Sequence, residues 1–456
     1  MLSFQTFFDR CAEKFPLALS TRLLLERTLA PNILDEFYEA TAREQYTKTT
    51  LFSDLVALMS GVVHRMHRSV HAAFHKSALA QKIKLSALYD KLNGIEPHVS
   101  SALVRDHAAR ITQIIDDLGA SLPPLVPGYA TRIIDGNAIG ASDHRLEVLR
   151  DLRSGPLPAK SLPIFDYEHD VVSELIPCED GHAQERSLSD EILARAKPKE
   201  LWIADRNFCT AKLIVGLVQC GAAVLIREHR CIPIQEASPL TVVSRKGKTI
   251  LREGTVTLTY EGKTVLLRRI WLTLPKATRD GDREIVVLTS LPPEAASAEE
   301  VMEHYRRRWT IESMFADLTV SLRCEIKALG HPRAALFVFA TAVVSANTLA
   351  GVRAGFRAAH GADVEERVSV YQLVDDLQGS YRITEALDDT SEATLAMSSS
   401  EFLAVFLSLV HRVDLRRYPK ARTRPRPAPR TRGSATDSPH VSTYRLLQEQ
   451  RQRRRP

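Results

Sequence analysis

The stretch LWIADRNFCTAKLIVGLVQCGAAVLIRE, Leu201–Glu228, decides the fold class of this chain because it holds three elements in a row. LWIAD is a short apolar strand, FCTAKLIVGLVQCG has the period of an amphipathic helix, and AAVLIRE is a second strand. A strand ending at RIIDGN, a hairpin across residues 161–180 and a helix near residues 182–196 precede them. Strands and helices in this order predict a mixed α/β sheet.

The sequence on either side of this sheet, and within it after residue 232, shows other residue patterns. Residues 1–125 show helical periodicity without a convincing strand, and they are either a helical DNA-end-binding domain or the cap of a helical bundle. The break SLPPLVPG (Ser121–Gly128) ends them, and residues 126–355 hold the sheet. Within that range, β-branched residues and Gly-Lys turns over residues 232–291 are typical of an antiparallel β insertion. Further helices are predicted over residues 356–415.

The formal net charge of +6 comes from the carboxyl-terminal tail. Residues 416–456 carry 13 Lys and Arg against 2 Asp and Glu, so the rest of the chain is net acidic. The tail is rich in arginine and proline, and we predict that it is disordered. It would either bind phosphates non-specifically or keep the chain soluble. Overall basicity therefore does not indicate that the body of the protein binds nucleic acid.

Cysteine usage and the apolar segments indicate a cytoplasmic protein. The six cysteines form no C-x-x-C pair, which fits a reducing compartment, and charges appear too early at the amino terminus for a secretory signal. The uncharged run AALFVFATAVVSANTLAGV, residues 334–352, approaches the length of a membrane span. Polar residues interrupt it, so we interpret it as a buried core helix and expect no membrane partner.

Three acidic residues form the strongest chemical pattern. Asp135 ends the strand in RIIDGN and Asp205 ends the strand in LWIAD, although either could simply serve a turn or cap a helix. Sites in α/β sheets gather at the carboxyl ends of strands. With Glu312 on a helix packed across the sheet, these carboxylates can hold two Mg²⁺ ions, because hard cations prefer oxygen ligands. A metal pair of this kind promotes phosphoryl transfer.

The helix expected to carry Glu312 contains the segment EHYRRRWTIESMFADL. Tyr305, Arg308 and Glu312 stand at positions i, i+3 and i+7, so in a regular helix they share one stripe. An apolar stripe beside it faces the core. Arg308 and Tyr305 are thereby placed to hold a phosphate through charge-assisted hydrogen bonds.

In these motifs the chain resembles the Asp-Asp-Glu (DDE) transposases of bacterial insertion sequences, in the subgroup with a Tyr-Arg-Glu-Lys signature. The matching segments are IIDGN, WIADRNF and YRRRWTIE, in which Tyr305, Arg308 and Glu312 keep the family spacing. The segment EIKALGHPRAALFVFA is also similar, and the resemblance covers roughly residues 125–355.

This resemblance implies an RNase H-like fold with the β insertion placed before the glutamate helix. It implies that Asp135, Asp205 and Glu312 are the catalytic residues and hold two Mg²⁺ ions, with Mn²⁺ as a substitute. The implied partners are DNA (the terminal inverted repeats of the element and the target) and a second copy of the chain, forming a homodimer in a synaptic complex. A nucleoid-associated location follows from these partners.

One position departs from the family signature. The expected lysine at position 319 is Thr319, and Arg323, one turn further along the same stripe, could contact the same DNA phosphate. In the β insertion, Trp271 could stack on a flipped DNA base, as hairpin-forming relatives require. A core tryptophan is the alternative interpretation of Trp271.

The sequence therefore predicts a transposase that cuts the ends of an insertion sequence and joins them to target DNA. Two alternatives remain open: a metal-dependent nuclease that cuts without joining, and a catalytically inactive DNA-binding repressor of transposition. The presence of Asp135, Asp205 and Glu312 argues against the repressor.

Overall fold

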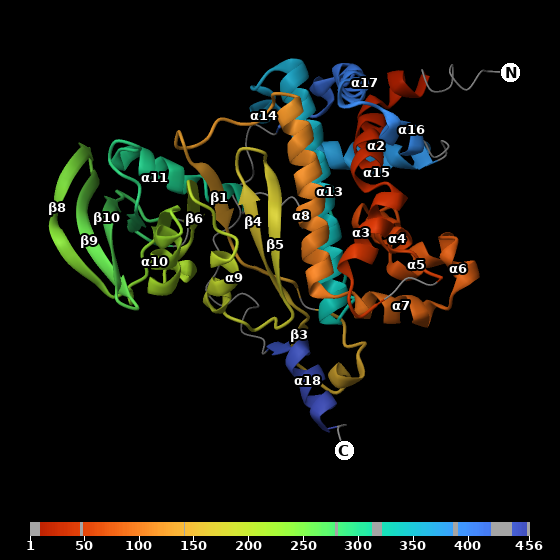
Figure 1. Cartoon of the computed structure of the whole chain (residues 1–456), viewed down its shortest axis with the longest axis horizontal. Helices are drawn as coiled ribbons and strands as arrows, with labels where there is room; N and C mark the ends of the chain where they lie inside the picture. Colours follow the sequence, from red (N-terminus) through yellow and green to blue (C-terminus); the bar gives the residue numbers. More distant parts are fainter. Residues whose placement is uncertain are drawn as a thin grey trace.

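Ten strands form one continuous mixed sheet that makes up one side of the structure, a computed structural model, and a group of helices makes up the other side (Figure 1). The structure describes residues 10–45, 49–140, 142–278, 281–311, 322–385, 391–420 and 440–453. From one edge to the other the strands are β5 (Val171–Cys178), β4 (Lys160–Asp166), β1 (Ala130–Ile134), β6 (Glu200–Ala204), β7 (Ala223–Arg227), β11 (Glu284–Thr289), β10 (Lys263–Thr273), β9 (Thr249–Tyr260) and β8 (Ile234–Lys246), with β2 (Asn137–Ala138) beside β4. The predicted mixed α/β sheet is confirmed.

The middle of this sheet is parallel and its flanks are antiparallel. β6 runs parallel to both β1 and β7, whereas β4 runs antiparallel to β1. Hydrophobic residues fill both faces of β6, whose five residues are all buried, as expected for a strand covered on two sides. The carboxyl ends of β1 and β6 therefore lie at the same edge of the sheet.

The predicted antiparallel insertion is present and extends the same sheet. β8, β9 and β10 are long strands joined as hairpins, and β11 pairs with β7. Gly247 and Gly262, in the two hairpin turns, have positive φ angles of 63° and 75°, a conformation that glycine adopts without strain. The helix α10 (Ala211–Gln219) and the helix α11 (Ala298–Arg306) pack against these strands.

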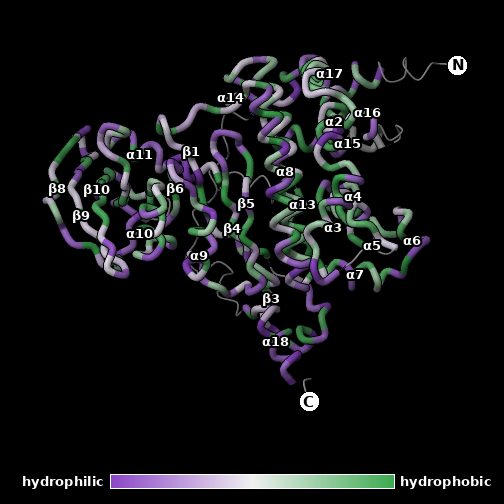
Figure 2. Tube along the Cα trace, in the orientation of Figure 1, coloured by the Kyte–Doolittle hydropathy of each residue, from purple (hydrophilic) through white to green (hydrophobic). Residues whose placement is uncertain are grey.

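One long helix, α13 (Pro332–His360), forms the centre of the helical part of the molecule. It packs against helices from both ends of the chain, among them α2 (Pro16–Leu29), α4 (Phe52–Val63), α7 (Leu85–Gly94), α8 (Pro97–Asp117) and α17 (Ser399–His411). Within the described residues it is the one helix that has the length and composition of a membrane span, yet 94% of its most apolar window is buried inside the protein. It is therefore a core helix, as predicted. Figure 2 shows hydrophobic residues along α13 and the helices around it.

Two polar side chains, one on α13 and one on α8, form hydrogen bonds with the backbone of the edge strand β5. The buried amide of Asn347 on α13 donates to the carbonyl of Val172 at 2.9 Å and accepts from its N–H at 2.8 Å. From α8, the hydroxyl of Ser101 donates to the carbonyl of Leu175 at 2.6 Å. These bonds satisfy buried polar groups and cover an edge that would otherwise be open to pairing.

The remaining helices complete this bundle, and they require a correction to the predicted boundaries. The further helices before the sheet are α3 (Pro31–Thr41), α5 (Val70–Lys76) and α6 (Leu79–Lys82), and those after α13 are α14 (Val364–Arg367), α15 (Val370–Glu385) and α16 (Ser391–Ala396). The predicted boundary at residue 355 falls inside α13, so no break in the chain separates the sheet from the last helices. Helices from both ends of the chain therefore pack on the same helix, α13, and the binding of DNA ends by the amino-terminal helices stays a prediction.

The carboxyl-terminal tail is not disordered throughout, contrary to the prediction. The strand β12 (His440–Ser442) pairs in parallel with β3 (Gly155–Leu157), and the helix α18 (Thr443–Arg453) follows it. Thr443 is fully buried, and the guanidinium of Arg445 pairs with the carboxylate of Asp180 at 2.8 Å. Composition alone missed this docking because the partner strand lies almost 300 residues earlier in the sequence. Residues 421–439 lie outside the described residues.

Truncation of the chain after Lys420 is therefore expected to lower the free energy of unfolding by about 1–3 kcal/mol, the range of one disruptive mutation. The loss follows from removing the β12–β3 pairing and the ion pair of Arg445. Thermal and denaturant unfolding would measure it. Truncation after Arg453 is the control, because it leaves β12 and α18 in place. Equal stability of the two truncated proteins would contradict the docking.

Candidate active site

Asp135 and Asp205 lie side by side at the edge of the sheet. Asp135 follows the last residue of β1 and Asp205 follows the last residue of β6, and those two last residues, Ile134 and Ala204, are register partners. Adjacent parallel strands are about 4.8 Å apart, so the two aspartates leave the sheet at neighbouring positions. We refer to them as the carboxylate pair. The structure thus brings together two residues that are 70 positions apart in the sequence.

The environment of Asp135 disfavours a negative charge. Burial, together with the nearby charges of Asp205 and Glu185, raises the pKa of Asp135 to about 7, against the opposing effects of Arg308 and of a hydrogen bond from the Gly136 N–H. The N–H of Gly136 donates to Asp135 Oδ1 at 2.9 Å, and Arg308 Nη1 donates to Oδ2 at 3.1 Å. Perturbed carboxyls of this kind concentrate at functional sites.

Asp205 has a second, local role. Its Oδ1 accepts a hydrogen bond from the backbone N–H of Asn207 at 2.8 Å, and so it caps the short 3₁₀ helix η3 (Arg206–Phe208). Asp205 therefore does cap a helix, which was the alternative interpretation of this residue from the sequence. A cap uses only one carboxylate oxygen, and the other remains available for a ligand.

The structure describes the first two residues of the predicted stripe, Tyr305 and Arg308. The helix α11 ends at Arg306, and the next N–H groups bond three residues back, from Arg308 to Tyr305 and from Ile311 to Arg308. Side chains three residues apart eclipse in such a tight turn, so Tyr305 and Arg308 lie on the same side. Glu312 and Thr319 lie outside the described residues.

Arg308 contacts the carboxylate pair directly, and Tyr305 supports Arg308. Tyr305 is 6% exposed, so it lies inside the hydrophobic core and not at the edge of that core, where a phosphate-binding stripe would lie. Burial raises the pKa of Tyr305 to about 12, and its hydroxyl is hydrogen-bonded to Arg308. A buried phenol thus orients the guanidinium that reaches Asp135.

Arg323 and Trp271 are not part of this cluster in the structure. Arg323 lies beyond any helical segment, and its Nη1 donates to the carbonyl of Arg68 at 2.7 Å, so the predicted shared stripe with Arg308 is wrong. Trp271 is half-buried on β10, three strands away from β6, beneath the guanidinium of Arg269 at 5.1 Å from the ring centroid. Base stacking by Trp271 stays a prediction.

Glu185 is a third acidic residue at the site, and sequence reasoning missed it. It begins the 3₁₀ helix η2 (Glu185–Leu188). Its Oε1 lies only 2.0 Å from where a Cβ on Gly136 would be, and its Oε2 accepts a hydrogen bond from Asn207 Nδ2 at 3.4 Å. Burial and the charge of Asp205 raise the pKa of Glu185. One signal of this contact was present in the sequence: a glycine directly after Asp135 is compatible with the close approach of another group.

The chemistry of the carboxylate pair fits a divalent cation. Two partly buried carboxylates at neighbouring positions supply the hard oxygen ligands that Mg²⁺ prefers, and a cation would relieve the repulsion that helps to raise the pKa of Asp135. Two side chains give only part of a coordination sphere, and among the described residues no cluster of three metal-ligating side chains is found. Glu312 would supply a third carboxylate.

Arg308→Gln is expected to move the pH dependence of Mn²⁺ binding upward. Arg308 lowers the pKa of Asp135, so its removal lets that pKa rise above about 7. A carboxylate must lose its proton to bind metal, so half-maximal binding should then need a higher pH. Titration calorimetry between pH 6 and about 9 would measure the shift of this midpoint, because that pH range brackets the raised pKa of Asp135. A midpoint that stays in place or falls would show that Arg308 does not control Asp135.

Comparison with known proteins points to one class of enzyme. The family model "Transposase DDE domain" matches residues 165–343. This match supports a DDE transposase, an enzyme that acts on DNA. A solved structure, the cryo-EM structure of the piggyBac transposase synaptic complex with hairpin DNA, is similar at a TM-score of 0.38 and 12% sequence identity, over 88% of this chain and 86% of that chain. No curated protein matches the chain.

Proposed function

We propose that this protein is a DDE transposase of a bacterial insertion sequence, in the subgroup with the Tyr-Arg-Glu-Lys signature. It would cut the ends of the element and join them to target DNA. The observation that carries this proposal is the placement of Asp135 and Asp205 at adjacent strand ends, with Arg308 bound to the first of them. The match of the DDE domain model to residues 165–343 supports it.

The order of the strands supports an RNase H-like label for the central sheet. β5, β4, β1, β6 and β7 lie in this order, with β4 antiparallel to its neighbour and the last three strands parallel. The strands β8 to β11 come between β7 and α11 in the chain, which is the place where the insertion was expected.

Asp135, Asp205 and Glu312 would hold two Mg²⁺ ions, and Mn²⁺ would serve as a substitute. When bound, the metal pair stabilises the attacking and leaving oxygens of an in-line displacement at phosphorus. Arg308, which is hydrogen-bonded to Asp135 and to Tyr305, would contact a DNA phosphate beside the metal site. The hydrogen bond to the buried Tyr305 would hold that guanidinium beside the carboxylate pair.

The remaining partners follow from the same proposal. DNA ends would be held by the amino-terminal helices together with the catalytic sheet, and two copies of the chain would pair the two ends in a synaptic complex. The arginines of the tail, residues 416–456, would add phosphate contacts that weaken as salt is raised.

A strand-transfer assay tests this function against the nuclease alternative. The protein, Mg²⁺, a labelled duplex ending in the inverted repeat that borders its gene, and a supercoiled plasmid are combined. We expect labelled repeat ends covalently joined to the plasmid. Cut ends without joined products would support the nuclease, and binding without cutting would support the repressor.

A further inference from the structure

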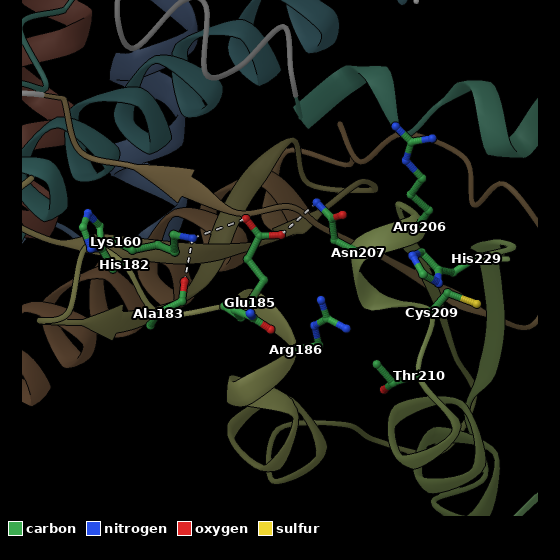
Figure 3. Close-up of a pocket in the computed structure, with 11 residues that line it drawn as sticks. Lys160, His182, Ala183, Glu185, Arg186, Arg206, Asn207, Cys209, Thr210 and His229 are labelled. Carbon is green, nitrogen blue, oxygen red and sulfur yellow. Dashed lines mark hydrogen bonds and ion pairs between the residues drawn. The ribbon is translucent and has the colours of Figure 1, made fainter. Parts of the chain in front are cut away.

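A polar cavity of about 320 Å³ lies next to the carboxylate pair (Figure 3). It is enclosed by η2, by the start of β4 and by the loop after Asp205, and its lining includes Lys160, Glu185, Arg186 and Asn207. Its size is that of a small ligand site. Asn207, two residues after Asp205, links the cavity to the candidate active site.

The acidic wall of the cavity is already neutralised by the protein. Lys160 Nζ lies 3.9 Å from Glu185 Oε1 and donates to the carbonyl of Ala183 at 2.8 Å, while Asn207 donates to the other oxygen of Glu185 (Figure 3). These contacts fix Glu185 between the cavity and Gly136. Its charge is thus balanced without drawing on the arginines of the lining.

Two arginines of the cavity have no such partner. Both Arg186 and Arg206 are exposed, and in the described part of the chain neither guanidinium makes a hydrogen bond or an ion pair. Arg206 acts on Asp282 only at a distance, by lowering its pKa. By contrast Arg132, Arg195 and Arg227, on or next to the same sheet, are all paired with acids.

Figure 3 shows how the two arginines are placed. The guanidinium of Arg186 lies inside the cavity, between Glu185 and Thr210, whereas Arg206 extends from the rim, away from Glu185. Planar guanidinium groups bind phosphate oxygens with two parallel hydrogen bonds. A site with an unpaired Arg186, a neutralised acid and the amide of Asn207 therefore fits an anion with several oxygens.

We propose that this cavity binds a phosphodiester of the DNA strand that continues past the cut bond into the flanking DNA. The proposal rests on the proposed function, because the strand is defined by the bond that the carboxylate pair would act on. Arg186 would bind the phosphate within the cavity, and Arg206 would bind the next phosphate outward. Glu185 would separate this subsite from the carboxylate pair.

The test compares two labelled duplexes by fluorescence anisotropy. One ends flush at the inverted repeat, and the other continues by several flanking nucleotides. Arg186→Gln is expected to weaken binding of the flanked duplex about tenfold, the usual loss for a charge-assisted hydrogen bond, and to leave the flush duplex unchanged. Each lost phosphate contact should also reduce the salt dependence of flanked-duplex binding by about one ion.

Two variants serve as controls. Arg186→Lys keeps the charge and is expected to retain most of the affinity for the flanked duplex. Arg367→Ala removes an exposed arginine of α14 that pairs with Asp363, far in the sequence from the helices proposed to hold DNA, so it should not alter either duplex. Thermal unfolding of Arg186→Gln checks that the fold is kept.

Three results would overturn the proposal. Equal affinity of Arg186→Gln and the wild-type protein for the flanked duplex would show that the cavity holds no phosphate. Equal loss on both duplexes would place Arg186 on the repeat. A defect confined to capture of the target plasmid by a pre-cut end would assign the cavity to target DNA. The wild-type protein's cleavage of the flanked duplex reports separately on the proposed function.

Discussion

Asp205→Asn is expected to abolish cleavage of a DNA end while leaving the protein folded and able to bind that end. Asparagine caps a helix as well as aspartate does, so the hydrogen bond from Asn207 to position 205 should persist. The substitution removes one negative charge from the carboxylate pair. Since loss of a partner that merely supports a metal ligand costs about 10–100-fold in activity, loss of a ligand itself should cost more.

Gel assays of cleavage and of binding would measure this result, with circular dichroism to monitor the fold. Asp190→Asn is a matched control, because Asp190 is an exposed aspartate paired with Lys212 on a neighbouring helix. Asp205→Ala removes both cap and charge, and it should also loosen η3. Cleavage by Asp205→Asn within a few-fold of the wild-type rate would remove Asp205 from the proposed chemistry.

Asp135→Asn is expected to abolish cleavage and, in the absence of divalent ions, to stabilise the protein. The pKa of Asp135 is about 7 in the folded chain, well above the value of an unfolded aspartate. A carboxyl with a raised pKa binds its proton more tightly in the folded state, so ionising it lowers stability as the pH rises. The free energy of unfolding of the wild-type protein should fall between pH 4 and about 7 and then remain low. At pH 8 the loss attributable to Asp135 is roughly 2–4 kcal/mol.

Asparagine carries no charge, and its single side-chain oxygen can still accept the hydrogen bond from the Gly136 N–H, although the bond from Arg308 is lost. Denaturant unfolding of the two proteins at pH 5 and about 8, with chelator present, would measure the difference over the window in which this carboxyl ionises. The control Asp106→Asn changes an exposed aspartate on α8. If Asp135→Asn were less stable than the wild-type protein at the higher pH, this would contradict the prediction that ionised Asp135 destabilises the folded protein.

Local patterns in the sequence were sufficient for the elements that position the site. The apolar run before Asp205 and the periodic helix after it predicted β6 and α10, and RIIDGN predicted β1. A strand that ends in aspartate is visible in the sequence. Its pairing with the other such strand follows only from the α/β class, and the register of Ile134 with Ala204 bears it out.

The features that the sequence did not predict depend on contacts between distant segments. Glu185 looks like one of several charges on a surface helix until Gly136 and Asn207 are folded against it. Arg323 fits the stripe of a regular helix, but its guanidinium bonds to the carbonyl of Arg68 in the amino-terminal region. Tyr305 was expected to contact a phosphate from its helical stripe, but packing on the β insertion buries its side chain.

The end of α11 shows the same limit within one segment. Helical spacing placed Tyr305 and Arg308 on a single stripe, and the tight turn that follows Arg306 keeps them on one side. Arg308 then reaches Asp135, which lies 173 residues earlier in the sequence. A pattern of residues cannot reveal that a distant carboxylate competes for one member of the stripe.

The central claim is that Asp135, Asp205 and Glu312 together form one divalent-metal site that cuts DNA. The measurement that tests it most directly is cleavage of a labelled duplex, ending in the inverted repeat that borders the gene, by the wild-type protein and by Glu312→Gln. Glu303→Gln is the matched control, because Glu303 is exposed on α11 and pairs with Arg306. We expect Mg²⁺-dependent cutting by the wild-type protein and the control, and binding without cutting by Glu312→Gln. Cutting by Glu312→Gln at the wild-type rate, or cutting by the wild-type protein in chelator, would contradict it.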